Sequence, residues 1–187
     1  MSRIYSLKTT ISPQQVQKFF DGRAKKEANP VNAVMLQSDK STIATERDEY
    51  ERTNLLPMPT SRSRILDLGC GAGRLASCFV DTAHEYLGLD FSHELIAIAS
   101  TQYQNQENIR FEIAEVPNLK HDSHAFSQLH DLIIVTGLFI YLNDEDVAKT
   151  LRLIANVASP SARVYIRETV SVISQRLTLK EFFSEEL

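Results

Sequence analysis

A carboxylate and three glycines occupy alternate positions at the end of a short apolar segment: Asp67, Gly69, Gly71 and Gly73. Glycine adopts positive φ without strain and lets the main chain approach a ligand closely. A tight turn alone does not need three alternating glycines preceded by a carboxylate. Because a strand is expected before the glycines and a helix after them, over residues 74–82, the segment predicts a ligand-binding loop.

The type of ligand follows from the details of this loop. A dinucleotide-binding loop has the pattern G-x-G-x-x-G and places a pyrophosphate on the N-terminus of the next helix. Here Arg74 occupies the position of the last glycine of that pattern. Asp67 adds negative charge beside the loop, which suits a ligand with a cationic amine better than a pyrophosphate. A nucleotide-dependent oxidoreductase is therefore disfavoured.

Further polar residues follow other expected strands, and parallel strands bring their carboxyl ends to one edge of a sheet. Asp90 ends a strand over residues 86–89, and a carboxylate there can accept hydrogen bonds from both hydroxyls of a ribose. NAD-binding folds use the same position, so Asp90 alone does not discriminate between ligands. Glu115 and Val116 follow a strand over residues 109–114, and Thr136 ends an apolar run over residues 132–136.

Taken in order, these residues resemble the motifs of the class I S-adenosyl-L-methionine-dependent methyltransferases over residues 60–168. The first motif of that family, acidic-x-Gly-x-Gly-x-Gly, holds the amino-acid end of the cofactor, and the match here is complete. The resemblance implies that the cofactor is S-adenosylmethionine. It also implies ten cofactor-binding residues: Asp67, Gly69, Cys70, Gly71, Gly73, Asp90, Phe91, Glu115, Val116 and Thr136.

The resemblance also implies individual roles. Asp90 looks like the acid that binds the ribose, and Glu115 takes the place of an acid, more often Asp, that contacts the adenine amino group. Phe91 and Val116 would pack near the rings, and Thr136 would lie near the methionine moiety and the acceptor. A surface glutamate at position 115 and a core aromatic at position 91 remain alternative interpretations. The chain lacks an Asn-Pro-Pro-Tyr or Asp-Pro-Pro-Tyr sequence after the fourth strand, which argues against methylation of exocyclic base amines or glutamine amides.

No residue is assigned a catalytic role. A methyl-transfer reaction needs a general base only when the acceptor must lose a proton. Candidate bases are Tyr141 and the five histidines. His84 and His93 flank the second strand and are expected at the surface. His121, His124 and His130 lie in the loop before the fourth strand, where the family does not usually place its base. Arg23, Arg47 and Tyr50 could reach the cofactor carboxylate or an acidic acceptor, but solvated helix side chains are the simpler interpretation.

The elements that must position these residues predict an α/β fold. Residues 1–60 lack strand alternation and are expected to form an N-terminal helical cap, with one helix starting at Ser12-Pro13 and another over residues 42–55. Residues 61–187 alternate strands and helices, which predicts a Rossmann-like, mostly parallel sheet with helices on both faces. Ser92 is expected to cap one helix, Asn143 or Asp144 another that ends at Pro160, and the fifth strand covers residues 162–167.

Composition narrows the function classes. The 187 residues carry a net charge of -4 and no basic stripe, which disfavours nucleic acid as a partner. The two cysteines form neither a disulfide framework nor a metal-ligand spacing, so we expect no metal and a reducing compartment. No segment approaches the ~20 apolar residues of a membrane span, and the N-terminus lacks the apolar stretch of a secretory signal. These features favour a cytoplasmic protein without membrane contact.

The end of the chain departs from the family pattern. The family sheet has seven strands, whereas only about twenty residues follow the fifth strand here. We expect an open edge on that strand, with lowered stability or a homo-oligomer formed through the edge. The favoured function is methyl transfer to a small-molecule acceptor, and the alternative is a cofactor-binding module without activity of its own. The sequence does not identify the acceptor or the atom methylated.

Overall fold

A computed structural model describes residues 10–27, 29–35, 42–59, 62–120 and 126–169. Its sheet has five strands in the order β3-β2-β1-β4-β5, and every neighbouring pair is parallel. The strands are β1 (Ser63–Leu68), β2 (Ala83–Asp90), β3 (Ile109–Ile113), β4 (His130–Thr136) and β5 (Ala158–Arg167). The order reverses between β1 and β4, so the topological switch point lies at their carboxyl ends. The predicted Rossmann-like fold class is confirmed.

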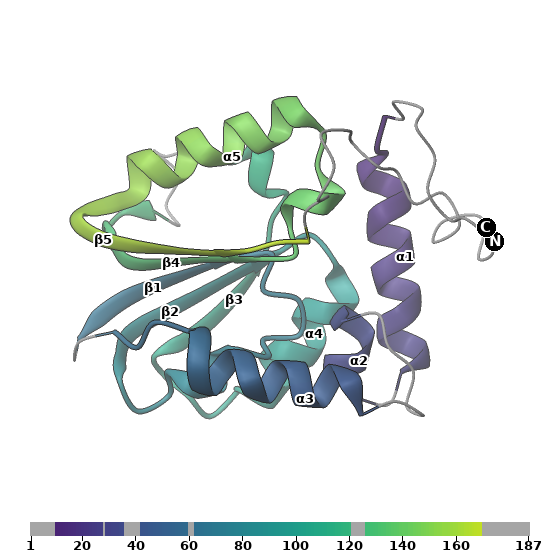
Figure 1. Ribbon diagram of the computed structural model, residues 1–187, viewed down its shortest axis with the longest axis horizontal. Coiled ribbons are helices and arrows are strands. Elements are labelled where there is room, and N and C mark those ends of the chain that lie inside the picture. The colour runs from purple at the N-terminus through teal and green to yellow at the C-terminus, as the bar shows by residue number, and fades with distance from the viewer. Residues whose placement is uncertain (1–9, 28, 36–41, 60–61, 121–125, 170–187) are drawn as a thin grey trace.

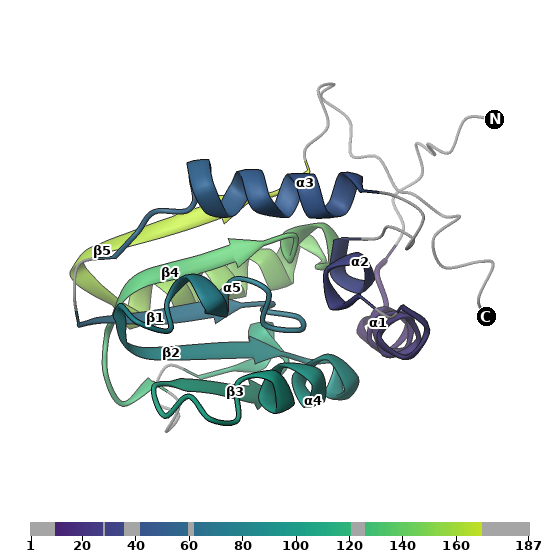
Figure 2. The ribbon, with the colours of Figure 1, turned by 90° about the horizontal axis from the view of Figure 1, so that it is seen from below.

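Helices cover both faces of this sheet (Figures 1 and 2). On one face lies α5 (Asp144–Val157), whose Leu153, Ile154 and Val157 pack against strand residues such as Leu66 and Ile133. On the other lie α4 (His93–Gln102) and α3 (Ile43–Tyr50), which continues into a π-helical turn, Glu51–Leu55. Because successive strand side chains point to opposite faces, strands covered on both sides are apolar throughout.

The N-terminal helices lie across the carboxyl ends of the strands (Figure 1). Helix α1 (Pro13–Lys26) begins as predicted, with the Ser12 side chain accepting a hydrogen bond from the Gln15 N–H. Gln17 Nε2 donates to the Phe91 carbonyl at 2.6 Å, and Asn143 Nδ2 donates to the Ile11 carbonyl at 2.9 Å. These bonds attach the cap to both sides of the switch point. The predicted N-terminal helical cap is present.

Three details of the structure differ from the sequence-based prediction. Residues 74–82 form turns around a short 3-10 helix, Ala76–Cys78, because the positive φ of Gly73 delays any helix and the chain must enter β2 at Ala83. Pro30 begins a short helix that was not predicted, α2 (Pro30–Met35), since the first helical position needs no N–H donor. Helix α5 ends at Val157, and Pro160 lies inside edge strand β5, where proline is tolerated.

Within the described residues, no helix is both long and apolar enough to cross a membrane.

Candidate functional site

A cavity of about 260 Å³ lies at the carboxyl ends of β1, β2 and β4, and the N-terminal helices supply part of its lining. Nine of the ten residues predicted to bind a cofactor line it: Asp67, Gly69, Cys70, Gly71, Asp90, Phe91, Glu115, Val116 and Thr136. Gly73 does not line the cavity. A Cβ at Gly73 would lie 2.8 Å from the Phe111 ring, so this glycine allows the loop to pack against the sheet.

The glycine loop depends on glycine for its path. Gly69, Gly71 and Gly73 have φ values of +75°, +55° and +73°, which other residues rarely adopt. A Cβ at Gly71 would lie 2.7 Å from Val34 Cγ1 of α2, so the cap rests directly on the loop. The Gly69 N–H donates to the Leu89 carbonyl of β2 at 2.8 Å. The loop is therefore fixed from both sides.

Asp90 is buried where β2 meets this loop. Its Oδ2 accepts a hydrogen bond from the Gly71 N–H and its Oδ1 accepts one from the Ser92 N–H, both at 2.9 Å. Burial raises the pKa of Asp90 to about 6, and the two backbone N–H groups oppose that rise. Each carboxylate oxygen can accept a second hydrogen bond, so Asp90 retains capacity for the hydroxyls of a ligand.

Asp67 is more deeply buried, with 1% of its surface exposed. The Tyr86 hydroxyl donates to Asp67 Oδ2 at 2.6 Å, whereas Oδ1 has no hydrogen-bond partner within the described residues. Burial raises the pKa of Asp67 to about 6, while Tyr86 and Arg74 oppose the rise. Buried carboxylate oxygens rarely lack a partner, and this one belongs to a cavity-lining residue. The arrangement fits a cationic amino group, which would supply the missing donor.

The other predicted residues differ in their surroundings. Glu115 is exposed at the rim and accepts a hydrogen bond from Asn118 Nδ2 at 2.7 Å. Phe91 is half-buried at the cap, and Val116 belongs to the core that packs against α5. Cys70 is buried, and this burial raises the pKa of its thiol, so it is not a nucleophile at neutral pH.

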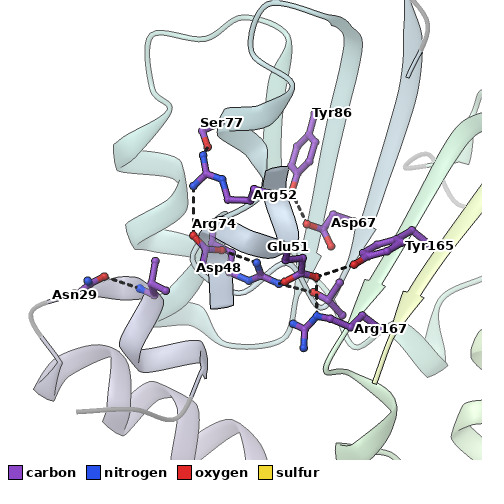
Figure 3. Close-up of polar contacts among 12 residues, drawn as sticks. Asn29, Asp48, Glu51, Arg52, Asp67, Arg74, Ser77, Tyr86, Tyr165 and Arg167 are labelled. Atoms are coloured by element: carbon purple, nitrogen blue, oxygen red, sulfur yellow. Dashed lines mark hydrogen bonds and ion pairs between the residues drawn. The ribbon is translucent and has the colours of Figure 1, made fainter. Parts of the chain in front are cut away.

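A buried ionic cluster borders the cavity (Figure 3). Arg74 Nη1 lies 2.7 Å from Asp48 Oδ1, and Arg74 Nη2 lies 2.8 Å from Glu51 Oε2. Arg167 of β5 forms an ion pair with Glu51 Oε1 at 2.6 Å, and Arg74 also donates to Thr136 Oγ1 at 3.2 Å. The cluster joins the segment of α3 and its π-helical turn to the glycine loop and to the ends of β4 and β5.

Comparison with known proteins identifies the family of this chain. A family model described as "Methyltransferase domain" matches residues 65–161, which contain the glycine loop and Asp90. The chain is a class I S-adenosylmethionine-dependent methyltransferase domain. S-adenosylmethionine is thus its cofactor. An amino group such as that molecule carries has the chemistry to donate to the Asp67 oxygen that lacks a partner within the described residues.

Relatives of this methyltransferase domain are longer proteins. Phosphoethanolamine N-methyltransferase 1 of Triticum aestivum is 29% identical over 167 residues, which cover 83% of this chain and 30% of that protein. The uncharacterized methyltransferase YcgJ of Bacillus subtilis is 30% identical over 102 residues, covering 54% of this chain and 38% of that protein. The chain therefore spans only about a third of the length of these relatives.

A solved structure shows the same fold. Phosphoethanolamine N-methyltransferase 1 of Haemonchus contortus, in complex with phosphoethanolamine and S-adenosylhomocysteine, superposes with a TM-score of 0.71 at 23% identity. The superposition covers 84% of this chain and 32% of that one. At this identity the likeness supports the methyltransferase fold and carries no information about the acceptor.

The candidate bases of the methyltransferase domain mostly lie away from the cavity. His84 and His93 are exposed, and His130 is buried at the amino end of β4, opposite the cavity. Burial also lowers the pKa of His130. His121 and His124 lie outside the described residues. Tyr141 does line the cavity, but burial raises its pKa, so its hydroxyl stays protonated at neutral pH.

The three other candidates also have definite positions. Arg23 donates to the carbonyls of Asn32 and Ala33, both at 2.9 Å, and so braces α1 against α2. Arg47 lines the cavity, whereas Tyr50 is 60% exposed and is not among the cavity-lining residues. The described residues contain no group of three or more His, Cys, Asp or Glu side chains that could hold a metal ion.

The structure adds residues that sequence reasoning missed. Glu168 Oε1 accepts hydrogen bonds from the Leu138 and Phe139 N–H groups, both at 2.8 Å, and thereby fixes the turn that carries Tyr141 over the cavity. Glu168 lies thirty residues from Leu138, and no local pattern links the two. No local pattern links Arg74 with Asp48 or Tyr86 with Asp67 either, because each contact joins residues from separate elements.

Proposed function

We propose that this domain binds S-adenosylmethionine in the cavity at the switch point and transfers its methyl group to a small-molecule acceptor. The observation that carries the proposal is the convergence of nine motif residues on one cavity. One of them is Asp67, whose Oδ1 has no hydrogen-bond partner within the described residues. Two buried carboxylates beside a glycine loop suit a ligand that presents an amino group and hydroxyls.

Each end of the cavity has a separate role in this proposal. Asp67 binds the amino group of the methionine moiety, and Asp90 accepts hydrogen bonds from the ribose hydroxyls. Phe91 and Val116 pack against the adenine, with Glu115 at the rim beside its amino group. Thr136 lies at the end of β4, on the side of the cavity toward the acceptor. The main chain of Gly69, Cys70 and Gly71 forms the floor, with Gly73 supporting its path.

The chemistry depends mainly on positioning. When bound, S-adenosylmethionine supplies a methyl group that is already activated on a sulfonium sulfur. The protein holds the two reactants in line and excludes water from the space between them. Apolar side chains of the cap, including Val16, Phe20 and Val34, line the cavity and provide this exclusion. Among the described residues no histidine lines the cavity, which favours an acceptor that needs no strong base.

We infer a small acceptor because side chains of the cap line the cavity and the net charge of -4 does not favour binding to nucleic acid. The free Cys70 and Cys78 agree with our proposal of a cytoplasmic location, where thiols remain reduced. Because a relative is named as a phosphoethanolamine N-methyltransferase, phosphoethanolamine is a reasonable first acceptor to test.

The test is transfer of a labelled methyl group from S-adenosylmethionine to a panel of amines, carboxylates and phenols that includes phosphoethanolamine. We expect labelled product with at least one acceptor and none with the Asp90→Ala variant. Binding of S-adenosylhomocysteine without transfer to any acceptor would instead support the alternative, a cofactor-binding module without activity of its own.

A further inference from the structure

Tyr86 connects the core of the sheet to the glycine loop. Its side chain is fully buried in β2, with its ring centroid 6.0 Å from that of Phe79 and 5.8 Å from that of Phe111. A buried tyrosine hydroxyl needs a hydrogen-bond partner, and here the partner is Asp67 Oδ2 at 2.6 Å (Figure 3). The aromatic packing fixes the ring, so the hydroxyl is held at one place beneath the cavity.

This contact leaves the Asp67 carboxylate with one occupied oxygen and one open oxygen. Oδ2 is bound to Tyr86 on the core side, and Oδ1 is the buried atom without a partner among the described residues. A carboxylate free to rotate could offer either oxygen to a ligand, whereas the bond to Tyr86 leaves Oδ1 as the open acceptor. Preorganised acceptors bind a cation without the reorganisation that a mobile group would require.

We propose that Tyr86 is a positioning residue of the cofactor site: its hydroxyl fixes the Asp67 carboxylate so that Oδ1 receives the amino group of the ligand, and it favours the ionised form that this contact requires. The inference rests on the proposed function, because it assumes that Asp67 binds the amino group of S-adenosylmethionine.

Several charged groups face Asp67 from the surrounding elements. Arg74 of the glycine loop favours the ionised carboxylate, whereas Asp90 of β2 and Glu51 of the π-helical turn oppose it. Arg74 is itself bound by Asp48 and Glu51. Within the described residues, the Tyr86 hydroxyl donates the only side-chain hydrogen bond that Asp67 accepts. Burial outweighs these contributions and raises the pKa of Asp67 to about 6.

The contact between Tyr86 and Asp67 should change how the affinity for the ligand depends on pH. Because protonated Asp67 cannot pair with an ammonium group, affinity for the ligand falls as the pH drops through about 6. Each hydrogen bond to a carboxylate lowers its pKa by about one unit. Removing the Tyr86 hydroxyl therefore moves the fall in affinity to about one pH unit higher. At pH 6.5 this shift reduces the ionised fraction of Asp67 by about threefold.

The experiment compares Tyr86→Phe with the wild-type protein. We measure the Kd of S-adenosylhomocysteine by calorimetry from pH 5.5 to 8.5, and we follow the Asp67 carboxyl carbon by NMR in the ligand-free protein. We expect a titration midpoint about one unit higher in the variant, and binding that is at least threefold weaker at pH 6.5, with the difference narrowing toward pH 8.5.

Tyr103→Phe is the matched control. Tyr103 is also buried against Phe111, with ring centroids 5.6 Å apart, but its hydroxyl is bonded to Gln102 rather than to Asp67. Tyr103→Phe should leave both the Asp67 titration and the pH dependence of the Kd unchanged. A general loosening of the core would instead affect both variants alike. Because phenylalanine keeps the ring at each position, both proteins are expected to fold.

The two proposals fail in different ways. An Asp67 titration that is the same in wild type and Tyr86→Phe overturns the role of Tyr86, whatever happens to binding. If Asp67→Asn binds S-adenosylhomocysteine as tightly as wild type, the role of Asp67 in the proposed function fails, while the ligand-free titration still reports on Tyr86. Binding by Tyr86→Phe that equals that of wild type at every pH also contradicts the inference.

Discussion

Asp67 and Asp90 lie almost fully buried at the carboxyl edge of the sheet, and burial raises the pKa of each to about 6. The ordinary value for aspartate is 3.8, so between pH 4 and 6 the native protein binds more protons than the unfolded chain. Stability from these two groups is therefore highest below pH 4 and decreases as the pH rises through 6. At neutral pH both carboxylates destabilise the ligand-free protein, as groups retained for binding often do.

Asp67→Asn should accordingly stabilise the ligand-free protein while weakening cofactor binding. We expect the free energy of unfolding to increase by about 1–2 kcal/mol at pH 7.5, because a buried charge is removed, with the gain shrinking toward pH 4.5. Urea denaturation at the two pH values measures this difference. Asp81→Asn, at an exposed position, serves as the control and should have little effect. A variant less stable than wild type at pH 7.5 would contradict the account.

Residues close together in sequence were predictable, and residues that meet through the fold were not. Asp67 and the glycines form a local pattern, and Asp90 follows from its place at the end of a strand. Tyr86 is the middle of an apolar strand in sequence, so nothing distinguishes it from a core aromatic until β1 and β2 pair and place Asp67 beside it.

At the scale of elements, the contact between α2 and the glycine loop joins the cap to the cofactor site. Val34 of α2 packs where Gly71 has no side chain, and both residues line the cavity. The cap therefore contributes to the floor of the cavity as well as to its cover. A change at this contact should affect folding and binding together.

Gly71→Ala tests that contact. The added Cβ would lie 2.7 Å from Val34 Cγ1, at a φ of +55° that alanine disfavours. We expect a loss of about 2 kcal/mol in stability and at least tenfold weaker binding of S-adenosylhomocysteine, with partial recovery in a Gly71→Ala, Val34→Ala double variant. Gly22→Ala in α1, where nothing lies within 4 Å, should be neutral or stabilising by up to ~1 kcal/mol. Unchanged binding by Gly71→Ala would argue against a cap seated on the loop.

Arg74→Met tests the ionic cluster. The Arg74 side chain is 7% exposed, and its removal leaves Asp48 without its 2.7 Å ion pair and Glu51 without one of its two cations. Loss of one partner from a buried ion pair costs about 3–5 kcal/mol, which denaturant unfolding can measure. Arg110→Met is the comparison, because Arg110 is 51% exposed and its ion pairs should contribute less than ~1 kcal/mol. Equal effects of the two substitutions on the free energy of unfolding would mean that burial of the cluster does not strengthen its contribution to stability.

Hydrophobic periodicity and capping residues predicted most helices and strands, because both reflect local physical requirements of these elements. Ser12-Pro13 and Ser92 start helices because a side-chain oxygen accepts a free N–H of the first turn, and both side chains do so here. The helix expected over residues 74–82 failed because apolar spacing cannot report the positive φ of Gly73 or the short distance to β2. Asn143 is the N-cap of α5, as expected, but its side chain bonds to the main chain of Ile11 and makes no hydrogen bond to the first turn of the helix.

At the scale of the whole molecule, the described sheet ends at β5. Within the described residues this strand pairs only with β4, and its Val164 and Ile166 are 44% and 46% exposed. Sheet edges with unpaired N–H and C=O groups and apolar side chains favour association with other chains. We propose that the domain forms a homo-oligomer through this edge or, as a monomer, has lowered stability.

Sedimentation velocity at increasing protein concentration tests this proposal together with thermal unfolding. We expect self-association that Ile166→Lys weakens, because a charge on an edge strand opposes pairing. Leu151→Lys on α5, at a site 45% exposed, should leave the association unchanged. A wild-type protein that stays monomeric at all concentrations and unfolds only at high temperature would contradict the proposal.

The central claim is that the cavity at the ends of β1, β2 and β4 binds S-adenosylmethionine. Calorimetry with S-adenosylmethionine, S-adenosylhomocysteine and NAD, on wild type and Asp90→Ala, tests it most directly. We predict micromolar binding of the first two ligands, no binding of NAD, and a loss of at least tenfold in the variant, with circular dichroism confirming that the variant is folded. Absence of binding by folded wild-type protein, or equal binding by Asp90→Ala, would contradict the claim.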